Sequence, residues 1–95
     1  MAEVKDNPEQ SQYEIYVDGS KVGLMSYQIR GDTVTTPHTE IHPKYGGQGL
    51  GQQLVKEALD HIRDTGMFVR PTCPFVRDFI DNTPEYQEMV KQAER

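Results

Sequence analysis

The chain lacks the features that mark several protein classes. Its 95 residues include one cysteine and no tryptophan, and the formal net charge is -5. The single cysteine, Cys73, excludes an intramolecular disulfide. No cluster of Lys and Arg is present to neutralise phosphates, so no nucleic-acid partner is expected. No apolar run approaches the roughly 20 residues that cross a bilayer, so we expect no membrane association.

The length leaves room for one domain, because a chain this short cannot be split into two useful cores. Residues 1–11 mix charged and polar residues without a hydrophobic period, which predicts a flexible tail without chemistry. We assign the domain to residues 12–95. The N-terminus lacks the basic-then-apolar pattern of a secretory signal, so we expect a cytoplasmic protein. Nothing in the sequence fixes the oligomeric state.

Strand patterns dominate the first part of the domain. Alternation over 13–17 and 22–26, separated by the turn Asp18-Gly19-Ser20, predicts an antiparallel hairpin. After a second turn at Gly31-Asp32, residues 33–36 and 39–42 are extended, with Pro37 interrupting between them. A three- or four-stranded meander is therefore expected.

Helical patterns follow. Apolar residues from Leu50 to Ile62 recur along one helical face, and Gly66 ends the run. Residues 67–69 then predict a strand that joins the earlier ones through a crossover. Residues 75–80 have helical spacing. Thr83-Pro84-Glu85 is typical of the start of a last helix, which we expect to run through Ala93.

Four glycines lie within residues 45–51, between an extended segment and the long helix. Bare backbone lets a ligand approach closely, and free amides in the first helical turn attract anions. The pattern therefore predicts a diphosphate site. A simpler interpretation is that the glycines only permit a tight turn and close packing.

Two other phosphate-binding loops fit poorly. A nucleotide-triphosphate loop needs Lys and then Ser or Thr after its last glycine, whereas Gln52-Gln53 follow Gly51. A dinucleotide-binding fold needs further strand-helix units, for which too little chain remains.

The loop resembles the acyl-CoA signature of the GNAT superfamily of N-acetyltransferases: Gln or Arg, two residues, Gly, any residue, then Gly or Ala. Gly49-Leu50-Gly51 matches its second half, whereas Gly46 stands at its first position. The segments His38-Thr39-Glu40-Ile41, Pro71-Thr72-Cys73 and Pro84-Glu85-Tyr86 are similar to very small members of that superfamily.

This resemblance implies an α+β fold with a bent, mostly antiparallel sheet and two to three helices. It also implies acetyl-CoA or coenzyme A as cofactor, with pantetheine on the strand carrying Ile41 and pyrophosphate on the loop. The expected cofactor-binding residues are Ile41, His42, Tyr45, Gly46, Gly47, Gln48, Gly49, Leu50, Gly51 and Tyr86. Tyr86 would close over the pantetheine or donate a proton; alternatively it only packs.

Cys73 and Glu40 are the candidate catalytic residues. Cys73 would act as a thiolate, with its pKa lowered by the helix start after Pro74 or by His38 or His42; alternatively it is a small buried side chain. Glu40 would deprotonate the attacking amine, or it is a solvent-facing strand carboxylate. Alternation places Glu40 and His42 on one face of the strand and Thr39 and Ile41 on the other. With one cysteine and no repeated ligand spacing, we expect no metal site.

The leading hypothesis is an acetyl-CoA-dependent N-acetyltransferase that acts on a small-molecule or lysine-type primary amine. It proceeds by direct attack with Glu40 as base or through acetyl-Cys73. The alternatives are a non-catalytic CoA-binding module and an interaction domain without a cofactor.

Overall fold

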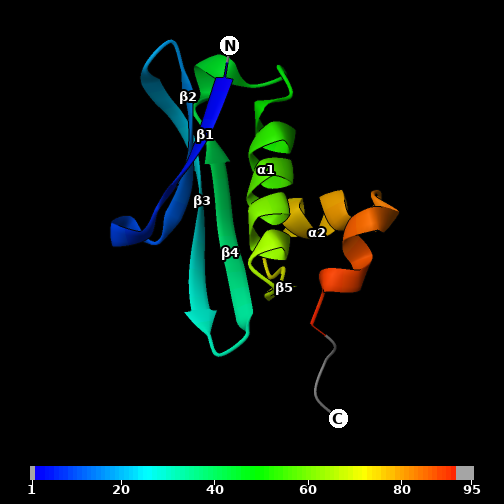
Figure 1. Cartoon of the computed structure of the whole chain (residues 1–95). Helices are drawn as coiled ribbons and strands as arrows, with labels where there is room; N and C mark the ends of the chain where they lie inside the picture. The colour runs from blue at the N-terminus through cyan, green and yellow to red at the C-terminus, as the bar shows by residue number, and fades with distance from the viewer. Residues whose placement is uncertain (1, 92–95) are drawn as a thin grey trace.

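The computed structural model describes residues 2–91, which form one curved five-stranded sheet with helices packed on one face (Figure 1). The strands lie side by side in sequence order. The elements are β1 (Ala2–Asn7), η1 (Pro8–Gln10), β2 (Gln12–Val17), β3 (Ser20–Arg30), β4 (Thr33–Ile41), η2 (Pro43–Tyr45), α1 (Leu50–Asp64), β5 (Phe68–Arg70), α2 (Pro74–Asp81) and η3 (Pro84–Met89). The predicted α+β fold is confirmed.

Strands β1 to β4 form an antiparallel meander, and β5 joins β4 in parallel. The hairpin turns use Gly19 and Gly31 at positive φ of 84° and 59°, a conformation that glycine adopts without steric cost. Helix α1 makes the crossover that a parallel pair requires. The predicted hairpin and crossover strand are both present.

A bulge divides β4 into two halves. Ser26 lies opposite His38 and Gln28 lies opposite Thr35, so Thr36 and Pro37 together face one β3 residue, Tyr27. Pro37 fits a bulge because it has no N–H to donate to the ladder. The strand therefore continues through Pro37, and the predicted interruption there is wrong.

The bulge also changes which side chains face the helices. Before it, Val34 and Thr36 are buried beneath α1; after it, the half-buried Thr39 and Ile41 alternate with exposed residues. Glu40 accordingly lies on the opposite, outer face, as the alternation predicts.

Beyond the bulge, β4 and β5 separate. Their pairing covers Thr33 to Thr35, and the last link is the Cys73 N–H, which donates to the Thr36 carbonyl at 2.9 Å. The His42 N–H donates to the Val22 carbonyl of β3. In an antiparallel pair, every second residue points its N–H towards the partner strand. The N–H groups of Thr39 and Ile41 therefore point away from β3. This half of β4 therefore presents main-chain groups to the gap between the strands.

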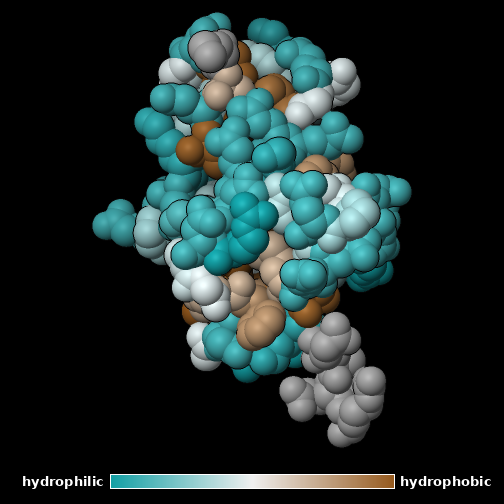
Figure 2. Space-filling model, turned by 45° about the vertical axis from the view of Figure 1, so that its right-hand side comes forward, coloured by the Kyte–Doolittle hydropathy of each residue, from teal (hydrophilic) through white to brown (hydrophobic). Residues whose placement is uncertain are grey.

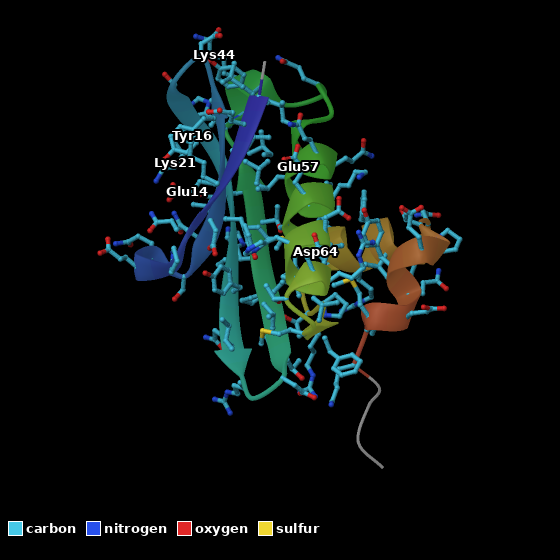
Figure 3. The ribbon with its side chains drawn as sticks, viewed as in Figure 1. Glu14, Tyr16, Lys21, Lys44, Glu57 and Asp64 are labelled. Atoms are coloured by element: carbon cyan, nitrogen blue, oxygen red, sulfur yellow. The ribbon has the colours of Figure 1, made fainter. Side chains whose placement is uncertain are left out.

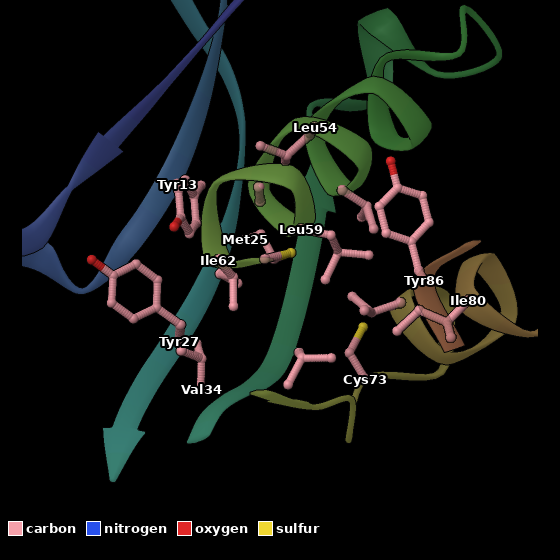
Figure 4. Packing of buried hydrophobic residues seen from close by; sticks show 14 of the residues in the cluster. Tyr13, Met25, Tyr27, Val34, Leu54, Leu59, Ile62, Cys73, Ile80 and Tyr86 are labelled. Atoms are coloured by element: carbon pink, nitrogen blue, oxygen red, sulfur yellow. The ribbon is translucent and has the colours of Figure 1, made fainter. Parts of the chain in front are cut away.

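Helix α1 packs its apolar stripe on the sheet and supplies much of the core. The stripe consists of Leu50, Leu54, Val55, Ala58, Leu59 and Ile62. Gly66, at φ 81°, follows the helix end, as predicted. Figure 4 shows this stripe between the tyrosines of the sheet and the residues of α2 and η3. The face seen in Figure 2 is mostly hydrophilic, with small apolar areas.

Two terminal predictions are wrong. Residues 2–7 are not a tail: they form β1, in which Val4 lies opposite Ile15 and the half-buried side chains of Ala2 and Val4 pack against the core. The last helix is the short 3-10 helix η3, and the chain is extended at Val90, where it bridges Val69. Ala93 lies outside the described residues. Among residues 2–91, no helix is long and apolar enough to span a membrane.

Candidate functional site

The glycine-rich loop between η2 and α1 has a backbone that only some of its glycines require. Gly47 and Gly49 have φ of 79° and 77°, which side chains disfavour, and the space where a Cβ would stand is open at both. Gly46 has φ -65° and ψ 151°, so any residue could occupy it. A Cβ at Gly51 would lie 3.0 Å from the Phe75 ring, so close packing against α2 explains that glycine.

The loop borders a cavity of about 500 Å³. Its walls come from the second half of β4, from η2, from the first turn of α1 and from the start of α2. The lining residues are Thr39, Glu40, Ile41, Tyr45, Gly46, Gly47, Gly49, Leu50, Gly51, Gln52 and Phe75. Seven of the ten predicted cofactor-binding residues are among them.

Helix α1 points its N-terminus into this cavity. The first helical hydrogen bond is donated by the Gln53 N–H to the Gly49 carbonyl at 3.1 Å. The preceding amides, those of Leu50, Gly51 and Gln52, therefore have no partner within the helix. Amides of this kind, together with the positive end of the helix dipole, are able to bind an anion.

Glu40 lies on the outer face of β4, beside the cavity. Its Oε1 atom is 3.0 Å from Nε2 of His38, and both side chains are exposed. Glu40 also lines a second hollow of about 410 Å³, which lies over β3 and β4 and includes Lys21 (labelled in Figure 3), Leu24 and His42. Glu40 and Ile41 therefore form a wall shared by both spaces.

Cys73 immediately precedes α2 and is buried, with 6% of its surface exposed. Its Sγ lies 3.6 Å from Oγ1 of Thr39. Burial acts to raise the pKa of the Cys73 thiol, but hydrogen bonds from the Val76 N–H, the Thr39 hydroxyl and the Phe75 N–H together hold that pKa below its ordinary value. The N–H groups at the start of α2 therefore help to lower the pKa of the thiol, as expected.

The histidines are not partners of the thiol. His38 contacts Glu40, and Nδ1 of His42 accepts the Lys44 N–H at 3.1 Å, which caps η2. Cys73 and Glu40 lie on opposite faces of β4, and Cys73 does not line the cavity. The two candidate catalytic residues are therefore not brought into one site.

Three other predicted residues lie apart from the cavity lining. His42 borders the second hollow, and Gln48 stands at the tip of the loop without lining either space. Tyr86 is fully buried against α1, and its hydroxyl donates to Oδ1 of Asp60 at 2.6 Å. Burial, followed by the Asp60 carboxylate, raises the pKa of Tyr86. Tyr86 is therefore a packing residue, which the sequence left as an alternative.

The sequence did not single out three lining residues: Thr39, Gln52 and Phe75. Phe75 is 42% exposed, which is unusual for a large apolar side chain at the start of an amphipathic helix. An aromatic residue directly after Pro74 is a weak signal, because the same spacing fits a core position.

Comparisons with known proteins agree with this geometry. The family model described as GCN5-related N-acetyl-transferase matches residues 12–89. Protein NATD1 of Danio rerio is 27% identical over 90 residues, covering 93% of this chain and 82% of that protein.

Two solved structures share the fold. A GCN5-like protein from Staphylococcus aureus superposes with a TM-score of 0.72 at 21% identity, covering 98% of this chain and 91% of that one. The PaiA N-acetyltransferase of Thermoplasma acidophilum, determined with coenzyme A, gives a TM-score of 0.58 at 18% identity, covering 63% of this chain and 38% of that one. With its sheet, its splayed strands and its glycine loop, the chain belongs to the GCN5-related N-acetyltransferase family.

Proposed function

We propose that the chain binds acetyl-CoA in the cavity beside the glycine-rich loop and transfers the acetyl group to a primary amine. The observation that carries this proposal is the set of unpartnered amides at the start of α1, which open onto that cavity. Family membership and the coenzyme A in the Thermoplasma structure support the choice of cofactor.

The chain's own groups fit such a cofactor. The amides of Leu50, Gly51 and Gln52 would hold the pyrophosphate, for which the open space at Gly47 and Gly49 leaves room. The Thr39 N–H already faces the Cys73 sulfur. The Thr39 carbonyl and the main-chain groups of Ile41 on β4 would pair with the amides of pantetheine. Phe75 and Ile41 supply an apolar wall for its methylene groups.

Bound acetyl-CoA supplies a thioester carbonyl for attack by the amine nitrogen, and the free CoA thiol is released. Glu40 is placed to accept the proton that the amine loses, directly or through water. Because Glu40 also lines the hollow on the outer face, that hollow is the proposed entry for a small-molecule or lysine-type amine.

A second route passes through acetyl-Cys73, and the lowered pKa of the thiol favours it. The thiolate would attack the thioester, CoA would leave, and the amine would then take the acetyl group from sulfur. Burial of Cys73 outside the cavity lining favours direct attack instead. We therefore assign the base to Glu40 and treat acetyl-Cys73 as the competing mechanism.

The rival function is a CoA-binding module without catalysis. The observation that favours it is Gly46 at the first signature position, which leaves the cofactor without the usual Gln or Arg contact. Calorimetric titration with CoA, followed by an acetyl-transfer assay on a panel of primary amines and a lysine peptide, separates the two. Binding with transfer supports the enzyme, binding without transfer supports the module, and absence of binding contradicts both.

A further inference from the structure

The cavity beside the glycine-rich loop extends along β4, from a loop end to a far end. At the loop end, the Ile41 side chain lies 3.6 Å from the place where a Cβ on Gly51 would stand. At the far end, Thr39 is the earliest residue of β4 that lines the cavity. Two residues of a strand span about 7 Å, because a strand rises roughly 3.3 Å per residue. The cavity therefore runs from the first turn of α1 to Thr39.

The gap between β4 and the segment that follows β5 closes just beyond Thr39. The Thr36 carbonyl accepts the Cys73 N–H at 2.9 Å and the Thr72 hydroxyl at 3.5 Å, so the two segments are joined there. Thr36 is fully buried, and Cys73 is nearly so. A ligand that follows β4 away from the glycine-rich loop therefore meets a closed junction.

Thr39 is held in place by the cysteine behind it. Cys73 Sγ lies 3.6 Å from Thr39 Oγ1, and Cys73 belongs to the cluster of buried side chains that forms the core (Figure 4). The N–H groups of Phe75 and Val76 also face the sulfur, which fills the corner between Thr39 and the start of α2. Because packed interiors leave few voids, Thr39 has little room to turn away from a ligand.

The two ends of the cavity set the direction of a bound cofactor. With the diphosphate at the start of α1, as proposed above, an extended pantetheine that pairs with β4 runs from Ile41 towards Thr39. The cofactor's sulfur and its acyl group then come last, at the end that Thr39 closes. The acyl group therefore extends towards the Thr39 side chain, with the Cys73 sulfur behind it.

We propose that Thr39, backed by Cys73, restricts the cofactor to acetyl-CoA by blocking longer acyl groups. This role rests on the proposed function, and it concerns specificity rather than catalysis. Each methylene group added to the acyl chain meets the Thr39 side chain instead of open space. One methylene group too many in a fitted pocket costs roughly tenfold or more in discrimination. We therefore expect butyryl-CoA to bind at least about tenfold more weakly than acetyl-CoA.

The test is calorimetric titration of the full chain with CoA, acetyl-CoA and butyryl-CoA, in the absence of any amine. The quantity compared is the ratio of the dissociation constants of butyryl-CoA and acetyl-CoA, which should be about 10 or more for the wild-type chain. Because both ligands are compared on one protein, a general loss of affinity or packing in a variant cancels from the ratio.

Three variants of Thr39 separate its volume from its hydroxyl group. Thr39→Ala removes both groups on Cβ and should lower the ratio to about 2. Thr39→Val keeps the branched shape without the hydroxyl, so the ratio should stay near the wild-type value. Thr39→Ser removes only the methyl group and keeps the hydroxyl that faces Cys73. Its ratio should be intermediate, and it tests the size limit even if Thr39→Ala does not fold.

The outcomes distinguish this proposal from the proposed function. Equal affinity of the wild-type chain for acetyl-CoA and butyryl-CoA overturns the size limit and leaves CoA binding intact. A ratio that Thr39→Ala and Thr39→Ser leave unchanged, or that Thr39→Val lowers equally, also overturns it. Absence of CoA binding by the wild-type chain contradicts the proposed function itself, and the size limit fails with it.

Discussion

The Cys73 sulfur lies 3.6 Å from the Thr39 hydroxyl oxygen, which joins the start of α2 to the inner face of β4 just beyond the bulge. Thr39 lines the cavity, whereas Cys73 lies behind it. The next residue, Glu40, faces the other side and contacts His38. Thiol and carboxylate are thus separated by the thickness of the strand, and this separation distinguishes the two proposed mechanisms.

Cys73 should not become acetylated during turnover. Because its sulfur is buried outside the cavity lining, direct attack by the amine is expected to be faster than transfer through sulfur. Intact-mass analysis after mixing with acetyl-CoA should show no acetyl adduct, and Cys73→Ala should retain transfer within about tenfold once its loss of packing is allowed for. An adduct that disappears in Cys73→Ala would establish the acetyl-cysteine route.

Removing the carboxylate of Glu40 should slow transfer without weakening the cofactor. For Glu40→Gln we expect kcat to fall about 100-fold, the usual contribution of a general base, with CoA affinity little changed. Stopped assays across a pH range and CoA calorimetry measure the two effects. Glu85→Gln, an exposed acid on η3, is the matched control. Equal activity of both variants would remove Glu40 from the mechanism.

Restoring the missing signature side chain should tighten CoA binding. Gly46 has backbone angles that any residue accepts, and a Cβ there would meet only the Pro43 carbonyl at 3.5 Å. A guanidinium at this position would border the proposed diphosphate site, so Gly46→Arg should increase affinity about fivefold. Gly46→Ala adds the Cβ without the charge and should show no gain. Calorimetry that finds the two variants alike would place the diphosphate elsewhere.

Glu14 should make the fold sensitive to acid. Its carboxylate is 3% exposed on the outer face of the sheet, near Tyr16 and Lys21 (Figure 3). Burial acts to raise its pKa, but hydrogen bonds from Gln12, Tyr16 and Asn7, with the Lys21 charge, lower the pKa from 4.5 to about 2.

A pKa lowered by folding contributes stability above pH 4.5, and that stability is lost as the pH falls towards 2. Glu14→Gln should therefore cost about 1–2 kcal/mol in the free energy of unfolding at pH 7. Its cost should shrink at pH 3, as measured by urea unfolding. The exposed Glu3→Gln on β1 is the control. A cost that does not depend on pH would contradict the lowered pKa.

The fold was largely predictable because its patterns are local. The alternation of apolar and polar residues predicted strands β2 and β3. The apolar stripe predicted helix α1, and Gly66 predicted where that helix ends. The strand β1 was missed because charged residues separate its few apolar side chains, and only pairing with β2 reveals its register. The last helix was overextended because Val90 bridges to Val69, a contact far away in sequence.

The part of the candidate site that is formed by main-chain groups of the glycine-rich loop was predictable from the sequence. Gly47 and Gly49 could be predicted from residue type alone, because glycine is the residue that most readily adopts the positive φ found at both positions. The placement of Phe75 and Tyr86 depends on how α2 and η3 pack against α1, which no local pattern encodes. The bulge at Thr36 and Pro37 decides which β4 residues face the cavity, and proline alone does not distinguish a bulge from a strand end.

The central claim is that main-chain amides at the start of α1 hold the cofactor's pyrophosphate. The most direct test follows backbone amide NMR signals during titration with CoA and, separately, with pantetheine, which lacks phosphate. CoA should shift the amides of Gly49, Leu50, Gly51 and Gln52, and pantetheine should leave them nearly unchanged. If CoA binds while those four signals stay in place, the claim is wrong.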